Sequence, residues 1–222
     1  MHEGRAPVLT FKAEAMRIKL PRLYPITDAR LSGLSHAAQV ARLADGGATF
    51  VQLREKHLPP REFYREAAEA IRIARARKVR LIINDRADIA LALGADGVHL
   101  GQDDLPPAAA RELLGKRALI GFSTHNLEQA IAAARLPVDY LAIGPIFRTS
   151  SKENADTPLG LEGLRRVREA TAPVPLVAIG GITLETAREV IRAGADSVAV
   201  ISLLLKEPAE IERRVRELIQ NL

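Results

Sequence analysis

The stretch that decides the fold is LVAIGGITLETAREVIRAGADSVAV, residues 176–200. The apolar runs Leu176–Ile179 and Ser197–Val200 are short enough to be buried strands. Between them Thr183–Ala193 has helical character, with Thr183 as the expected N-cap and Gly194 just beyond the helix end. Strand, helix and strand in this order predict a βαβ unit with two parallel strands.

A similar three-residue motif recurs along the chain before other apolar runs. It reads Gly47-Ala48-Thr49, Gly94-Ala95-Asp96, Pro137-Val138-Asp139 and Gly194-Ala195-Asp196, at intervals of 47, 43 and 57 residues. Each interval holds about two strand–helix units, and each motif stops a helix just before the next strand. The spacing indicates one repeated architecture without an internal linker.

Counting the apolar runs gives eight strands and therefore an α/β fold, a single (β/α)8 TIM barrel over residues 21–222. Residues 1–20 fit no barrel element and are predicted to be an N-terminal extension. The predicted strands are Leu23–Thr27, Phe50–Arg54, Leu81–Asn84, Gly97–Leu100, Leu119–Ser123, Tyr140–Ile143, Leu176–Ile179 and Ser197–Val200. Predicted helices include Glu62–Lys78, Leu127–Arg135 and Leu161–Glu169.

Composition narrows the function classes. The 222 residues are 47% hydrophobic and 27% charged, as in an ordinary globular protein. No apolar run is long enough to span a membrane, and the N-terminus has no signal-type apolar core. The absence of cysteine suits a cytoplasmic protein and excludes thiolate chemistry. The net charge of +5 is spread along helices and aromatic residues are few, so no nucleic-acid partner is expected.

The second strand ends in the strongest chemical signal, Gln52-Leu53-Arg54-Glu55-Lys56. Because strand side chains alternate, Gln52, Arg54 and Lys56 should point into the barrel mouth while Leu53 faces the helices. An inward Arg and Lys need a nearby anion, and together they suit a phosphate group. The alternative is a solvated loop of charges.

Acidic residues follow the third and fourth strands. Asp85 and Asp104 come from neighbouring strands and are expected to converge, and two carboxylates with substrate phosphate and water suit Mg2+. The alternatives are helix caps, by Asp85 near Ala87 and by Asp103 or Asp104 before the helix around residues 106–114.

For some other polar residues the sequence allows two interpretations. His99 has inward parity and either lines the pocket or makes a satisfied core hydrogen bond. Ser123 either donates to a ligand or, like Thr124, caps the next helix. His36 and His57 are predicted to lie on the surface.

The long polar segment from Arg148 to Pro158 follows the sixth strand. Its Thr149-Ser150-Ser151-Lys152 run has three hydroxyls and a cation, which suit an anion, so the segment is predicted to be a lid. The alternative is a solvent-exposed loop with no role in binding.

Glycines follow the seventh strand and a serine follows the eighth. Phosphate sites of such barrels often use these loops, and Gly180 and Gly181 permit close backbone approach. Together with Ile201 and Ser202 they predict a second, monophosphate site. Two phosphorylated substrates meeting in one mouth would follow.

These segments resemble the thiamine-phosphate synthase family over nearly the whole chain from about Leu23 to Leu205. The resemblance is carried, in the family's order, by Gln52–Lys56, Asn84-Asp85, GVHLGQDD (97–104), GFSTH (121–125), YLAIGPIFRTSSK (140–152), VAIGGIT (177–183) and GADSVAVIS (194–202).

The resemblance implies a transferase that joins hydroxymethylpyrimidine diphosphate to thiazole monophosphate and releases diphosphate. It implies that the pyrimidine diphosphate is held by Gln52, Leu53, Arg54, Glu55, Lys56, Asn84, Ser123 and Lys152, of which Arg54, Lys56, Ser123 and Lys152 act in catalysis. It implies Mg2+ on Asp85 and Asp104. It implies that thiazole phosphate is held by Thr149, Ser150, Ser151, Gly181, Ile201 and Ser202, with Ser151 where the family commonly has Thr.

Three alternatives remain. A thiazole tautomerase of the same family would not need Lys56, Asp104 and Lys152 together, although His125 could move protons. A sugar-phosphate epimerase would have no use for the acidic pair. A non-catalytic regulator would bind thiazole phosphate without turnover. Small phosphorylated molecules are the expected partners, a homo-oligomer is left open, and no membrane partner is expected.

Overall fold

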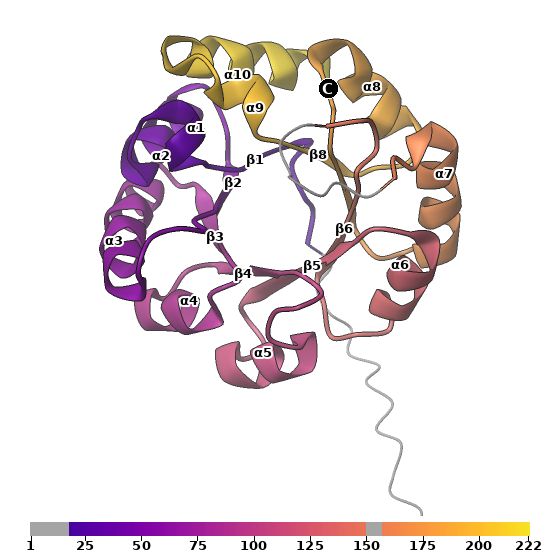
Figure 1. Cartoon of the computed structure of the whole chain (residues 1–222), viewed down its shortest axis with the longest axis horizontal. Coiled ribbons are helices and arrows are strands. Elements are labelled where there is room, and N and C mark those ends of the chain that lie inside the picture. Colours follow the sequence, from indigo (N-terminus) through magenta and orange to yellow (C-terminus); the bar gives the residue numbers. More distant parts are fainter. Residues whose placement is uncertain (1–17, 150–156) are drawn as a thin grey trace, which may run out of the picture.

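The eight strands form one parallel sheet that curls into a barrel. The computed structural model describes residues 18–149 and 157–222. The strand order is β1-β8-β7-β6-β5-β4-β3-β2, and a parallel bridge from Ile26 to Gln52 links the two ends (Figure 1). The (β/α)8 barrel is therefore confirmed. The strands are β1 Leu23–Pro25, β2 Phe50–Leu53, β3 Arg80–Asn84, β4 Gly97–Leu100, β5 Leu119–Thr124, β6 Tyr140–Ile143, β7 Leu176–Ile179 and β8 Ser197–Val200.

Helices surround the strands as an outer ring (Figure 1). They are α1 Ala29–Ser32, α2 His36–Asp45, α3 Pro60–Ala76, α4 Ala87–Leu93, α5 Pro107–Leu114, α6 Leu127–Ala133, α7 Gly160–Thr171, α8 Leu184–Arg192, α9 Ser202–Leu205 and α10 Ile211–Asn221, with the 3-10 helix η1 at Pro208–Glu210. The predicted helices are present, with ends shifted by up to two residues. No helix in the described parts of the chain is long and apolar enough to cross a bilayer.

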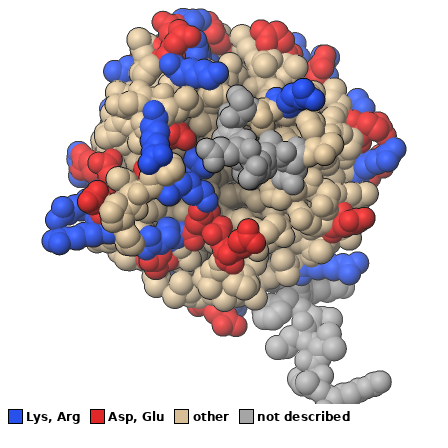
Figure 2. Space-filling view, in the orientation of Figure 1, with Lys and Arg blue, Asp and Glu red and all other residues tan. Residues whose placement is uncertain are grey.

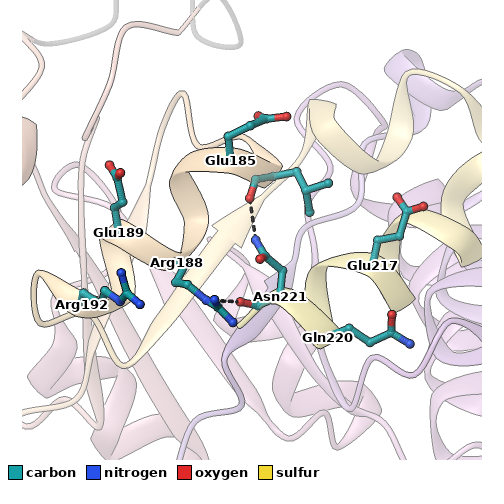
Figure 3. A pocket seen from close by; sticks show the side chains of 8 residues that line it. Glu185, Arg188, Glu189, Arg192, Glu217, Gln220 and Asn221 are labelled. Atoms are coloured by element: carbon teal, nitrogen blue, oxygen red, sulfur yellow. Dashed lines mark hydrogen bonds between the residues drawn. The ribbon is translucent and has the colours of Figure 1, made fainter.

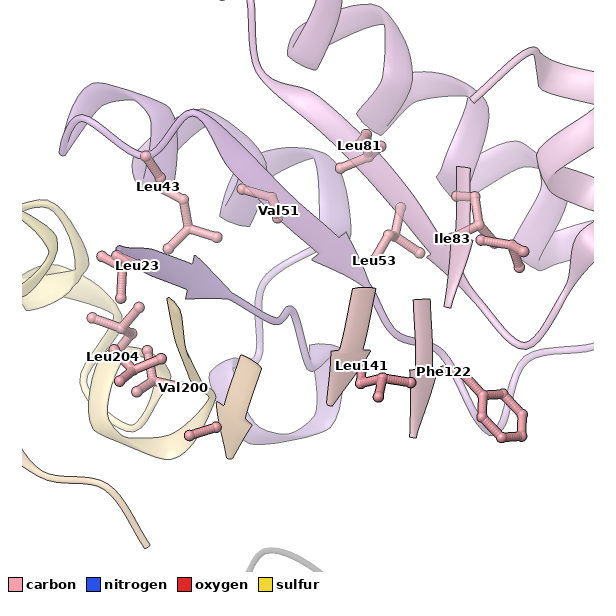
Figure 4. Packing of buried hydrophobic residues seen from close by; sticks show 14 of the residues in the cluster. Leu23, Leu43, Val51, Leu53, Leu81, Ile83, Phe122, Leu141, Val200 and Leu204 are labelled. Carbon is pink, nitrogen blue, oxygen red and sulfur yellow. The ribbon is translucent and has the colours of Figure 1, made fainter. Parts of the chain in front are cut away.

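Alternation along each strand produces two separate cores. Val51 and Leu53 of β2 point outward and pack with Leu43 and other helix residues (Figure 4). Phe50 of the same strand points inward to the barrel axis, where it packs with Tyr24 and Tyr140. The predicted inward side of β2, with Gln52 on it, is therefore confirmed, and the inward ends of the strands open at the mouth.

The observed N-caps agree with one prediction and differ from others. Thr183 caps α8 as expected, in a capping box with Thr186. Asn126, and not Ser123 or Thr124, caps α6.

Neither α4 nor α5 has a side-chain cap, so Asp85, Asp103 and Asp104 do not act as caps. Asp85 and Asp104 instead point toward each other, as the site below shows.

The surface placement of His36 was wrong, whereas His57 is exposed as predicted. His36 is fully buried because the imidazole is enclosed between Thr27 and Glu55, which lie on the segments after β1 and β2. Leu20 is also buried and packs in the inner core, while residues 1–17 lie outside the described residues.

Candidate active site

Charged side chains of both signs meet at the carboxyl ends of β2 and β3. Arg54 Nη1 donates to Asp28 Oδ2 at 3.1 Å, and Lys56 Nζ is paired with Asp85 Oδ2. Figure 2 shows Lys and Arg side chains beside Asp and Glu side chains along one edge of the central hollow. The predicted inward cations therefore lie at the mouth, already paired with carboxylates.

Asp85 and Asp104 converge as expected. Burial raises the pKa of Asp85, Lys56 opposes that rise, and a hydrogen bond with the Asp104 carboxyl adds to it. Asp104 Oδ2 also accepts from Gly101 N at 2.6 Å, which holds that carboxyl in place. A partly buried Asp85 carboxylate whose charge is disfavoured by burial and by Asp104 provides the kind of site that a cation stabilises.

This pair fits Mg2+ in donor chemistry. Both ligands are hard oxygens, and Mg2+ in such sites keeps waters and takes further oxygens from substrate phosphate. The described residues contain no group of three or more His, Cys, Asp or Glu side chains able to hold a metal. A metal here would therefore depend on substrate oxygens for much of its coordination.

Asp85 also has an unusual backbone. Its φ is +62°, a region that non-glycine residues rarely adopt. Asp85 N donates to His99 O at 2.8 Å, which ties the residue to the end of β4. A strained residue held in this way is a common feature of functional sites, because the surrounding fold keeps the side chain aimed.

The barrel floor below the charges is polar. Asn84 is 6% exposed, and its Nδ2 has no hydrogen-bond partner within the described structure. A buried donor without a partner costs free energy that a ligand acceptor would recover. Gln52 is also buried and donates to Tyr24 OH. Asn84 is thus suited to a ligand acceptor, and its role in holding the pyrimidine diphosphate stays a prediction.

The sequence did not predict the hydrogen bonds that hold the segment carrying Arg54 and Lys56 in place. Glu55 Oε2 lies 3.1 Å from His36 Nε2, and Glu55 Oε1 accepts from the backbone N of His57 and Leu58. Thr27 Oγ1 binds both His36 Nδ1 and Arg54 N. Glu55 and the buried Leu53 therefore shape the segment with their side chains turned away from the mouth. Histidine and glutamate 19 residues apart gave no local signal.

A cavity of about 530 Å3 lies on the opposite side, at the ends of β7 and β8. Its lining includes Thr149, Gly181 and Ser202, which were predicted to share a site, and the cations Arg148 and Lys206. Ile201 adjoins Ser202 but is not part of the lining. Ser150, Ser151 and Lys152, with most of the predicted lid, lie outside the described residues.

Glycine is required at and beside this cavity for steric reasons. A Cβ on Gly181 would lie 2.5 Å from Arg148 O, and one on Gly180 would lie 2.6 Å from Pro145 Cβ. Both glycines have positive φ, at +67° and +101°. The β7 loop therefore packs directly on the β6 loop, with bare backbone at the mouth.

A second cavity of about 590 Å3 lies on the outer ring between α8 and α10 (Figure 3). Glu185, Arg188 and Glu217 are among its lining residues, and Asn221 Nδ2 donates to Leu184 O at 2.7 Å. It contains none of the predicted site residues and lies on the outside of the barrel.

The profile of the family described as thiamine monophosphate synthase matches residues 23–204. The chain belongs to that family. A thiamine-phosphate synthase of Chloroflexus aurantiacus is 51% identical over 83% of this chain and 85% of its own length. One from Albidiferax ferrireducens is 48% identical over 93% of this chain and 95% of its own. The resemblance is confirmed, and the protein is an enzyme of the transferase class.

Solved structures agree. A thiamine phosphate pyrophosphorylase from Pyrococcus furiosus superposes with a TM-score of 0.82 and 38% identity, covering 92% of this chain and 96% of that one. A (S)-3-O-geranylgeranylglyceryl phosphate synthase from Thermoplasma acidophilum has a TM-score of 0.66 at 15% identity. At that identity the likeness concerns the barrel fold alone.

Proposed function

We propose that this protein is a thiamine-phosphate synthase, which joins hydroxymethylpyrimidine diphosphate to thiazole monophosphate and releases diphosphate. The observation that carries the proposal is the family match over residues 23–204, with relatives of that name close to half identical across most of the chain. The two-sided mouth, with charged side chains at β2–β4 and bare backbone at β7–β8, supports two different phosphate groups.

The charged side would bind the diphosphate. Diphosphate leaves readily only when its negative charge is neutralised, and Arg54, Lys56 and Lys152 are the proposed cations. Their present partners among the described residues, Asp28 for Arg54 and Asp85 for Lys56, are contacts that a substrate would replace or share. Asp85 and Asp104 would hold Mg2+, which, when bound, adds positive charge beside the leaving diphosphate.

The chemistry requires no side-chain nucleophile. As the carbon–oxygen bond breaks, the aminopyrimidine ring spreads positive charge from its methylene carbon, and the diphosphate departs with the bonding electron pair. The thiazole nitrogen then supplies the pair for the new carbon–nitrogen bond. Gln52, Asn84 and Ser123 would orient the pyrimidine, while Thr149, Gly181 and Ser202 would hold the thiazole phosphate. Positioning and electrostatics would provide the acceleration.

The test is product formation with both substrates and Mg2+, with Asp104→Ala and Asp103→Ala as matched variants. Asp103 is adjacent in sequence but exposed. We expect thiamine phosphate from the wild type and from Asp103→Ala, and its loss with EDTA or with Asp104→Ala. Folded wild-type protein that makes no product contradicts the proposal, and a tautomerase assay on thiazole phosphate would then test the first alternative. We expect the activity in the cytoplasmic fraction.

A further inference from the structure

A continuous chain of side-chain hydrogen bonds crosses the barrel interior from β2 to β5. Gln52 Nε2 donates to Tyr24 OH at 3.1 Å, and Tyr24 OH lies 2.8 Å from Tyr140 OH. Tyr140 OH lies 3.2 Å from His99 Nδ1, and His99 Nε2 lies 2.9 Å from Ser123 Oγ. The five residues come from five different strands, so only barrel closure brings them together.

With Gln52 Nε2 as the donor at one end, a direction follows for each later hydrogen bond of the chain. The Gln52 amide N–H can only donate, so the Tyr24 oxygen accepts there. A buried hydroxyl hydrogen needs an acceptor, and for Tyr24 the other partner is Tyr140. The Tyr140 hydrogen must then go to His99 Nδ1, which leaves the imidazole hydrogen on Nε2.

The last step concerns Ser123. With its hydrogen on Nε2, His99 donates to Ser123 Oγ. The serine oxygen is thereby used as an acceptor on its protein side, and its own hydrogen stays available. Ser123 is only partly buried and faces the mouth side of His99, whereas His99 and both tyrosines are buried.

We propose that Tyr24 and Tyr140 are positioning residues that fix the His99 tautomer, and that His99 in turn leaves the Ser123 hydroxyl hydrogen to donate to the substrate. The inference rests on the proposed function for the identity of that substrate. It adds a rule of specificity: the Ser123 hydrogen is left for an acceptor on the substrate, such as a ring nitrogen or a phosphate oxygen.

Packing around the chain keeps it rigid. The His99 and Tyr140 rings are stacked, with centroids 5.6 Å apart and planes at 23°. Gly121 makes room for the tyrosine, since a Cβ there would lie 2.1 Å from Tyr140 Cζ. With Nδ1 accepting the Tyr140 hydrogen, the His99 ring carries its single hydrogen on Nε2.

The direct test is nitrogen NMR of the intact protein labelled at its histidine rings. The chain has five histidines, and the His99 signals are those lost in His99→Asn. We expect Nε2 to carry the hydrogen and Nδ1 to be bare. A hydrogen on Nδ1 would overturn the proposal. This result does not depend on turnover, so a wild type that makes no product but shows this tautomer defeats the proposed function and leaves the tautomer assignment standing.

The kinetic test is a double-mutant cycle between Tyr140→Phe and Ser123→Ala. Tyr140→Phe should lower kcat/KM for the pyrimidine substrate about tenfold, the scale of one hydrogen bond, and leave the KM for thiazole phosphate unchanged. In the Ser123→Ala background the same change should have little further effect, because Tyr140 acts through Ser123.

Tyr64→Phe removes a hydroxyl from an exposed tyrosine of α3 and should behave as wild type. Full additivity of Tyr140→Phe and Ser123→Ala, or no loss in Tyr140→Phe, would overturn the positioning role. If Tyr140→Phe does not fold, the wild-type tautomer measurement decides the matter.

Discussion

The two sides of the barrel mouth differ in the groups that they present to a ligand. At β2–β4 the mouth presents charged side chains, with Lys56 on Asp85 and Asp85 against Asp104. At β7–β8 it presents backbone, with Gly180 and Gly181 pressed against the β6 loop. The first side depends on its paired charges, whereas the second depends on the close approach of two loop backbones. Substitutions at the two sides should therefore fail in different ways.

The largest effect is expected for Asp85→Asn, which should lower the synthase rate by about a thousandfold. Stability at pH 7 should not fall. The pKa of Asp85 is raised in the folded state, so the folded protein loses stability as pH rises through that pKa, and the amide avoids this loss. Asparagine also tolerates the positive φ. Product formation and thermal unfolding measured together check both parts.

Asp88→Asn is the matched control, since Asp88 is exposed on α4 and pairs with Arg86, the residue before the helix. It should leave the rate unchanged. An Asp85→Asn protein that is both inactive and strongly destabilised would break the comparison, because the charged side would then be structural.

Gly181→Ala should destabilise the protein by a steric clash. The new Cβ meets Arg148 O and Phe147 at a φ of +67°, so we expect about 2–4 kcal/mol of destabilisation and weaker thiazole phosphate binding. Gly33→Ala is the control, because Gly33 has the same φ of +67° and open space around it. It should cost about 1–2 kcal/mol. Equal losses in urea unfolding would show that backbone conformation, and not the close approach, explains the glycine.

Glu55→Gln tests the support behind the charged side. Burial raises the pKa of Glu55, but hydrogen bonds from His57 N, His36 and Leu58 N outweigh it, so the net pKa is below the usual 4.5. The carboxylate therefore stabilises the fold above pH 4.5, and this stabilisation is lost as pH falls through the lowered pKa. Unfolding free energies of the two proteins should differ at pH 7 and converge in acid. A constant difference would refute the assignment.

The smallest effect concerns salt. Inorganic diphosphate bound at the charged side should weaken several-fold as ionic strength rises from about 0.05 to about 0.5 M, because its attraction to Arg54 and Lys56 is screened. Inorganic phosphate at the backbone side should weaken less. Calorimetric titrations of both anions at the two salt concentrations provide the measurement, and equal salt dependence would argue against two distinct sides.

The sequence by itself determined what depends on local pattern. Period-two alternation placed Gln52 inward and Leu53 outward, and the neighbouring order of β3 and β4 brought Asp85 to Asp104. The Gly180-Gly181 pair after the seventh strand pointed to a backbone-lined site for the same reason. These features follow from chain geometry over a few residues.

Tertiary structure alone decided which distant polar groups meet. His36 looked exposed because nothing near it in sequence explains its burial, yet Thr27 and Glu55 enclose it. Tyr24 and Tyr140 are 116 residues apart and touch because β1 and β6 face each other across the closed barrel. The secondary-structure preferences of a short segment carry no information about such long-range contacts. They form because closure removes these groups from water, and each buried donor must then bond to whichever acceptor the fold places opposite it.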